Sequence, residues 1–144
     1  MDQLKLIAMD DEDLKIISAH VQDAVMNVGN IEFWKSARLF VLPMYRFVWE
    51  REPALLSSRA ERRNSVLNFN RVNSAKAMRI PREQPDEILS LLAITFTPTK
   101  APGGIVELAF SGGGTIRLDV ECIEARLSDL GGAWEASSRP VHKT

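Results

Sequence analysis

The chain has 144 residues, of which 18 are Lys or Arg and 19 are Asp or Glu, so its formal net charge is −1. This length fits one domain. A hydrophobic share of 45% and a charged share of 26% argue against a disordered chain. The near-neutral charge gives the whole molecule no strong field for nucleic acid or an anionic membrane. No apolar run approaches the ~20 residues of a membrane helix.

The cysteine and histidine content bounds the chemistry. Cys122 is the single cysteine of the sequence, so no intrachain disulfide can form, which favours a reducing compartment. The N-terminal segment, residues 1–8, lacks the basic start and apolar stretch of a secretory signal. With His20 and His142 as the two histidines, a thiolate or imidazole metal site lacks ligands. We therefore expect a cytoplasmic protein with no metal and no cofactor.

The N-terminal part predicts a short strand followed by a helix. Residues 4–8 are mostly apolar, and Asp10 is a favourable N-cap residue. Apolar residues then recur at helical spacing, which predicts an amphipathic helix over about 11–24. The acidic cluster Asp10–Asp13 lacks the spacing of a calcium-binding loop, so helix capping explains it. The helical set is Leu14, Ile17, Val21 and Ala24.

From residue 31 onward the apolar period changes to that of strands. Residues 38–50 are apolar on both faces, which is typical of a central or curled strand, and Pro43 marks an edge or a bulge. The polar residues 51–64 predict the longest loop. Residues 66–80 return to strand character with a bulge around Asn70–Arg71, where the parity slips.

The second half predicts further strands joined by tight turns. Residues 89–96, 105–110 and 115–121 have strand character, and Ser111–Gly114 predicts a hairpin with positive φ angles. Residues 120–130 fit either a strand after a bulge or a helix closing at Gly131; the preceding alternation favours the strand.

Together these elements predict an α+β fold. We expect one amphipathic helix packed on a curled antiparallel sheet or open barrel of about six strands. The expected organisation is a single domain over residues 1–131 and an irregular tail over residues 132–144.

The relevant segments are Leu4–Ala8, Ala19–Val25, Ala101–Gly104, Phe110–Gly114 and Ile116–Gly131. Together they resemble a family of small uncharacterised alphaproteobacterial proteins, known only as a domain of unknown function. The resemblance covers nearly the whole chain and implies a single-domain bacterial cytoplasmic protein, without an assigned reaction, cofactor or active-site residue. A pleckstrin-homology-like sheet is suggested by pattern analogy alone, and a fold does not specify a function.

The residues that could support catalysis have simpler structural explanations. Cys122 lies between Glu121 and Glu124, and negative neighbours disfavour a thiolate, so we interpret it as a buried structural cysteine. His20 is interpreted as a partly buried helix residue, with a ligand-binding role as the alternative. No Gly-x-Ser-x-Gly motif is present, and the glycines of residues 112–114 fit a hairpin better than a phosphate loop. We predict no catalytic residue.

The charge distribution is uneven along the chain. Residues 59–82 contain seven bases and one acid, whereas residues 105–135 contain two bases and six acids. These segments could pair as cross-strand ion pairs. Alternatively, the bases could form an arginine patch for an acidic protein, phosphate groups or RNA. The candidate partner-binding residues are Arg59, Arg62, Arg63, Arg71 and Arg79.

Three functions follow from these observations. The leading hypothesis is a non-catalytic protein-binding or adaptor module that uses a sheet face or the 51–64 loop. The second is an RNA- or phosphate-binding module that uses the arginines. The third is an enzyme with an unfamiliar site around His20. An open sheet edge could also support a homodimer. Nucleic acid is not favoured as a partner, because the chain is slightly acidic overall, and no membrane partner is expected.

Overall fold

A computed structural model describes residues 3–49 and 60–131, and the predicted tail over residues 132–144 therefore lies outside the described residues. Within these two ranges the chain forms ten strands, one α-helix and three single turns of 3-10 helix. The strands and the helix, in chain order, are β1 (Lys5–Ala8), α1 (Asp11–His20), β2 (Val25–Asn27), β3 (Glu32–Trp34), β4 (Leu39–Trp49), β5 (Ala60–Phe69), β6 (Val72–Met78), β7 (Ile88–Pro98), β8 (Gly104–Phe110), β9 (Thr115–Val120) and β10 (Ala125–Asp129).

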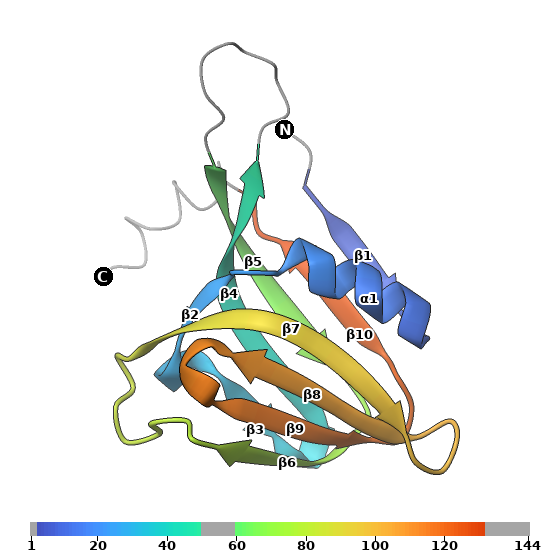
Figure 1. Ribbon diagram of the computed structural model, residues 1–144. Coiled ribbons are helices and arrows are strands. Elements are labelled where there is room, and N and C mark those ends of the chain that lie inside the picture. Colours follow the sequence, from blue (N-terminus) through green and yellow to red (C-terminus); the bar gives the residue numbers. More distant parts are fainter. Residues whose placement is uncertain (1–2, 50–59, 132–144) are drawn as a thin grey trace.

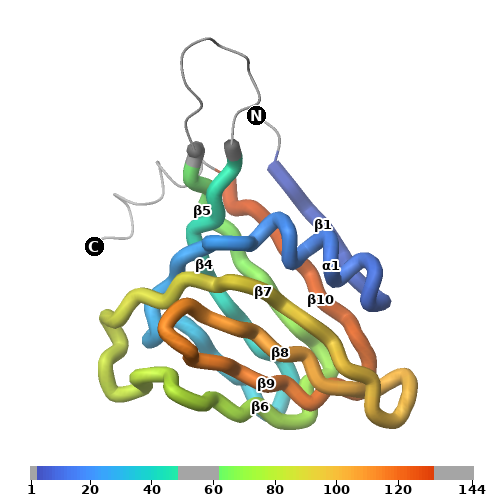
Figure 2. Tube along the Cα trace, viewed as in Figure 1, coloured from blue at the N-terminus to red at the C-terminus, as the bar shows by residue number. Residues whose placement is uncertain are grey.

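All strand pairs are antiparallel and form one open sheet. Its order is β1-β10-β5-β4-β2-β7-β8-β9-β6, and β3 pairs with β4 outside this path. The sheet curls into two layers, with β7, β8, β9 and β6 in front of β4, β5 and β10 (Figures 1 and 2). The predicted class, an antiparallel sheet with one helix, is confirmed, and residues 125–129 form a strand.

The strand number of about six was wrong, since the sheet has about ten. Strand β2 has three residues, too few for an alternating pattern to be recognised. The predicted single strand over residues 66–80 is also two strands. Arg71, with φ of 61°, separates β5, which pairs with β4 and β10, from β6, which pairs with β9.

Residues 60–64, which the sequence assigned to a loop, belong to β5. They pair in register with the end of β4, for example Asn64 with Tyr45. The prediction was wrong because these residues are polar. Backbone pairing with β4, and not the burial of one face, holds them as a strand. The remainder of the predicted loop, residues 51–59, lies outside the described residues.

The helix begins as predicted but ends earlier. The Asp10 carboxylate accepts a hydrogen bond from the Asp13 N–H at 2.8 Å, as expected of an N-cap. The helix ends at His20, and the Val21 N–H bonds back to Ile17. Val21 and Ala24 are nevertheless fully buried. Their apolar spacing therefore reflects burial, although neither residue is in the helix.

One continuous core fills the space between the two layers and α1. Leu42, Leu67 and Leu127 come from one layer, and Leu108 and Leu118 come from the other, all fully buried. The turn between β8 and β9 has positive φ at Gly112 and Gly113, as predicted. Of the described residues, none forms a helix long and apolar enough to cross a bilayer.

The sheet closes at one corner and stays open beyond it. The Val72 N–H, at the start of β6, donates to the Arg38 carbonyl at 3.0 Å. The Arg38 guanidinium also donates to Asn73 Oδ1 at 2.7 Å and to Glu121 Oε1 at 2.9 Å. Past Asn73, β6 has no strand on its outer side in the described part of the chain.

A buried carboxylate links the other end of the sheet. Asp129, whose side chain is fully buried, accepts hydrogen bonds from Arg46 Nε at 2.9 Å and from Arg46 Nη2 at 2.8 Å. Ser65 Oγ donates to it at 2.6 Å and the Leu4 N–H at 3.0 Å. Arg63 Nη1 lies 3.9 Å away. The cluster thereby holds β10, β4, β5 and the entry to β1 together.

Burial alone would raise the pKa of Asp129. The hydrogen bonds from Arg46, Ser65 and the Leu4 N–H outweigh burial and hold this pKa below its ordinary value of 3.8. Because the folded pKa is the lower one, the carboxylate stabilises the fold at and above the pKa of the unfolded chain. That stabilisation is lost as the pH falls through the folded value.

We expect Asp129→Asn to lower the free energy of unfolding by about 3–5 kcal/mol, because it leaves Arg46 buried without its counter-charge. Urea denaturation at pH 7 measures this loss. The difference between the wild type and the variant should begin to shrink as the pH falls below about 3.8, because the unfolded chain then binds a proton that the native carboxylate does not. The loss is complete once the pH is below the folded pKa.

Glu121→Gln is the matched control. Glu121 also contacts two arginines, Arg38 at 2.9 Å and Arg71 at 3.5 Å, but its side chain is 52% exposed. We expect little change in the urea midpoint, because solvent screens exposed pairs. An equal loss in both variants would contradict the special role of the buried carboxylate.

Candidate functional site

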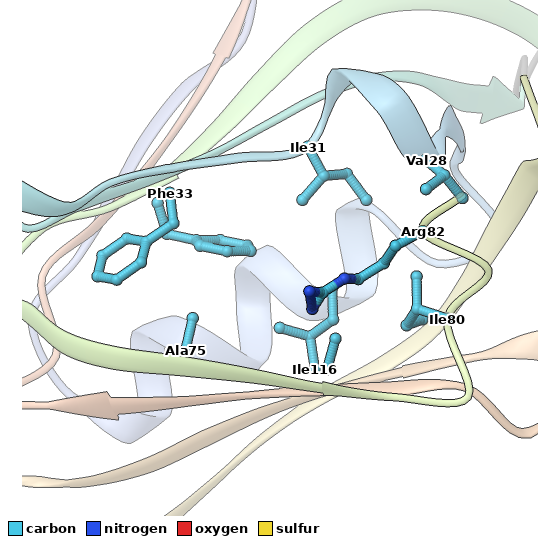
Figure 3. A pocket seen from close by; sticks show the side chains of 9 residues that line it. Val28, Ile31, Phe33, Ala75, Ile80, Arg82 and Ile116 are labelled. Atoms are coloured by element: carbon cyan, nitrogen blue, oxygen red, sulfur yellow. The ribbon is translucent and has the colours of Figure 1, made fainter. Parts of the chain in front are cut away.

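An apolar cavity of about 300 Å³ lies where the sheet stays open, between β3 and β6. Figure 3 shows Ile31 and Phe33 along one side of it and Ala75 on the strand opposite. This size is at the lower end of the range for small-molecule sites. Its lining residues are Val28, Ile31, Phe33, Phe40, Ala75, Ala77, Ile80, Arg82 and Ile116.

The cavity exists because β6 turns small side chains inward. Ala75 and Ala77 are half-buried and line the cavity, whereas Ser74, Lys76 and Met78 are exposed on the other face. On the opposite wall, Phe33 packs against Phe40 with 6.1 Å between ring centroids. Two alanines on β6 leave unfilled the space that larger side chains would occupy.

Arg82 is the charged residue of the lining. Its guanidinium points between Ile31 and Ile116 (Figure 3). Within the described ranges no carboxylate lies within ion-pairing distance of it. An apolar cavity with one cation at its wall is suited to an apolar group that carries a negative charge.

The outer edge of β6 borders the same cavity. One side of β6 pairs with β9 from Val72 to Met78. Along the other side, backbone N–H and C=O groups from Ser74 to Met78 have no partner strand among residues 3–49 and 60–131. Such an edge can accept a further strand.

The predicted arginines occupy separate places. Arg59 lies outside the described residues. Arg62 lies near the start of β5, where its guanidinium carbon is 5.8 Å from the centroid of the Tyr45 ring. Arg63 contacts the buried Asp129, and Arg71 lies at the other end of β5. The extended stretch of β5 from Arg62 to Phe69, about 23 Å, lies between Arg62 and the turn that contains Arg71.

Arg71 and Arg79 mark the two ends of β6. Both have left-handed backbone, with φ of 61° and 59°, which turns the chain at the sheet boundary. Arg71 Nε donates to Glu124 Oε1 at 3.0 Å, and this hydrogen bond raises the Arg71 pKa above its ordinary value. A hydrogen bond from Arg38 likewise lowers the Glu121 pKa. These arginines therefore do not gather with Arg62.

The basic and acidic segments of the sequence meet in part as ion pairs. Arg71 from the basic segment binds Glu121 and Glu124 of the acidic segment, and Arg63 lies near Asp129. Arg117 pairs with Glu107 across β9 and β8 at 3.2 Å. The three bases in and just after β6, Lys76, Arg79 and Arg82, have no such partner among the described residues.

The two reactive side chains considered in the sequence lie apart from this cavity. His20 Nδ1 lies 2.9 Å from the Ile16 carbonyl, beside a shallow hollow formed with Ala19 and Arg46 to Val48. Cys122 is half-buried, not fully buried as expected, because it lies in the exposed turn before β10. The described ranges contain no group of three or more His, Cys, Asp or Glu that could hold a metal ion.

Sequence reasoning missed the cavity. Lys76 and Arg82 were counted among the bases but were not selected. The available signal was the alternation of Ala75 and Ala77 with polar residues, which gives a strand with an unusually small inward face. The opposite wall could not be assigned, because Ile31 and Phe33 are distant from β6 in sequence.

We expect Ala77→Leu to leave the free energy of unfolding unchanged or raise it, because the new side chain enters empty apolar space. Ala125→Leu is the matched control, since Ala125 is 1% exposed in the filled core and overpacking costs about 1–3 kcal/mol. Urea denaturation of both variants measures the difference. An equal loss of stability in both would contradict the cavity.

Comparison with known sequences places the chain in a family. The model of the family described as "Protein of unknown function (DUF2948)" matches residues 4–142, nearly the whole chain. No curated protein and no solved structure matches the chain. The resemblance to a domain of unknown function is thus confirmed: this chain belongs to the DUF2948 family.

Proposed function

We propose that this chain is a non-catalytic protein-binding module that receives an extended segment of a partner protein as an added strand on β6. The observation that carries the proposal is the unpaired outer edge from Ser74 to Met78, beside an apolar cavity. Main-chain hydrogen bonds would supply affinity, and alternate side chains would supply selectivity.

The two faces of β6 define the partner sequence. An added strand alternates its side chains as β6 does. One set would lie beside Ala75 and Ala77 at the cavity and should be apolar. The other set would lie beside Ser74, Lys76 and Met78, whose side chains are exposed. The partner segment should therefore alternate apolar residues with residues whose charge complements the exposed face of β6, here called the outer face.

That outer face is positive. Lys76 lies directly opposite Arg117 on β9, and like charges in this position repel. Arg117 is neutralised by Glu107, whereas Lys76 has no carboxylate partner in the part of the chain that the structure describes. An acidic side chain on the added strand would relieve this repulsion, so the alternate residues should be Asp or Glu.

A protein partner is favoured over nucleic acid and over a substrate. Arg71 and Arg63 are close to carboxylates of the same chain, and Arg62 lies far from both Arg71 and Arg79 along the strands. A single phosphate-binding patch is therefore less well supported than a strand edge. His20 hydrogen-bonds a backbone carbonyl within its own helix, which fits a structural role.

The proposal keeps the bacterial cytoplasmic location that the sequence predicts. The pleckstrin-homology-like fold also stays a prediction from the strand pattern, and the proposed function does not depend on it.

We expect an acetylated peptide of about eight residues, alternating Glu and Val, to bind the full chain and protect the amides of Ser74–Met78 from hydrogen exchange. Lys76→Glu should weaken this binding about tenfold or more, because the variant repels the peptide. Lys100→Glu is the control, since Lys100 is an exposed lysine in the distant turn between β7 and β8. Fluorescence anisotropy measures the affinity.

Three outcomes would contradict the proposal. A peptide of the same composition in separate Glu and Val blocks could bind equally well, which would exclude an added strand. The alternating peptide could fail to bind while a single-stranded RNA oligonucleotide binds at low salt. Light scattering could also report a stable dimer that excludes the peptide, so that a second copy occupies the edge. If Lys76 only prevents unwanted association at the open strand edge, the peptide should not bind.

A further inference from the structure

We propose that the cavity between β3 and β6 is a binding site for a small apolar carboxylate, whose chain occupies the apolar space and whose carboxylate binds Arg82. This site goes beyond the proposed function, because it requires no protein partner.

The walls specify the apolar part of the ligand. Eight of the nine lining side chains are aliphatic or aromatic, and the ninth is Arg82. A volume of about 300 Å³ corresponds to about ten water-sized units, and so to a ligand of about ten non-hydrogen atoms. A carboxylic acid with an unbranched chain of eight carbons meets this limit.

Arg82 specifies the charged part. Its guanidinium points between Ile31 and Ile116 (Figure 3), next to the cavity. It is exposed, and among residues 3–49 and 60–131 no Asp or Glu forms an ion pair with it. A planar guanidinium binds a carboxylate through two parallel hydrogen bonds, which an alcohol or an ammonium group cannot form.

The backbone fixes the entrance to the cavity. The Arg82 N–H donates to the Ile80 carbonyl at 2.8 Å, so a tight turn through Pro81 follows the end of β6. Ile80 and Arg82, on either side of Pro81, both line the cavity. The cation is therefore held at the cavity by the backbone turn and not by the length of its side chain alone.

The test compares three ligands of equal chain length, namely octanoate, 1-octanol and octylammonium. We expect calorimetry at pH 7.4 to show saturable binding of octanoate to the full chain. Its affinity should be at least about tenfold higher than that of 1-octanol, and the difference from octylammonium should be larger still. Amide NMR signals of Ala75, Ala77 and Ile116 should shift with the same affinity.

Variants separate the two parts of the site. Arg82→Gln should reduce octanoate binding about tenfold, because the carboxylate loses the guanidinium that binds it. The variant should leave 1-octanol binding unchanged. Arg126→Gln is the control, since Arg126 is an exposed arginine on β10 outside the lining. Ala77→Leu fills the cavity and should abolish binding of both octanoate and 1-octanol.

The inference is overturned if octanoate shows no saturable binding, if 1-octanol binds equally well, or if either Arg82→Gln or Ala77→Leu leaves octanoate binding unchanged. The two experiments rest on different residues, since peptide binding depends on Lys76 and octanoate binding depends on Arg82. Peptide binding without octanoate binding would overturn the carboxylate site alone, and octanoate binding without peptide binding would overturn the protein-binding function alone.

Discussion

The sheet is closed at one corner, and both proposed sites depend on that incomplete closure. The hydrogen bond from the Val72 N–H to the Arg38 carbonyl joins the start of β6 to the segment between β3 and β4. Arg38 and Arg71 have left-handed backbone, with φ of 55° and 61°, so both chain segments turn sharply there. Beyond this corner β3 contributes only three residues, and β6 continues without a partner strand among the described residues. The gap between them becomes a cavity because apolar side chains face it but do not fill it.

At the opposite end, the Asp129 cluster fastens the layer to which the N-terminal strand belongs. A buried ion pair contributes little net stability in general, because desolvation offsets the attraction between the charges. Here every polar contact of the carboxylate also joins separate segments, since Arg46, Ser65 and the Leu4 N–H come from β4, β5 and the residue before β1. The cluster therefore specifies the register of the sheet. Apolar side chains in its place could not form the directional hydrogen bonds that align these strands.

The sequence predicted the local features well and the distant ones poorly. The Asp10 cap, the glycine turn after Phe110 and the strand around Leu118 depend on neighbouring residues, and all were recognised. The helix end was missed because Val21 and Ala24 stay buried in a turn. The pairing of β6 with β9 and the approach of Ile31 to Ala77 join residues at least 37 positions apart, and no periodicity contains that information. The cavity could thus be suggested by two alanines but not located.

The charge asymmetry is explained by the same topology. Because β10 lies beside β5 and β9 lies beside β6, the acidic C-terminal segment borders the basic one, and Arg71 meets Glu121 and Glu124. Of the seven bases in the basic segment, Arg63 and Arg71 are therefore close to carboxylates of the acidic segment. Lys76, Arg79 and Arg82 differ, since no Asp or Glu of the described ranges forms an ion pair with them. Function is best sought where the fold leaves charge uncompensated next to apolar surface, and in this chain both conditions hold at β6.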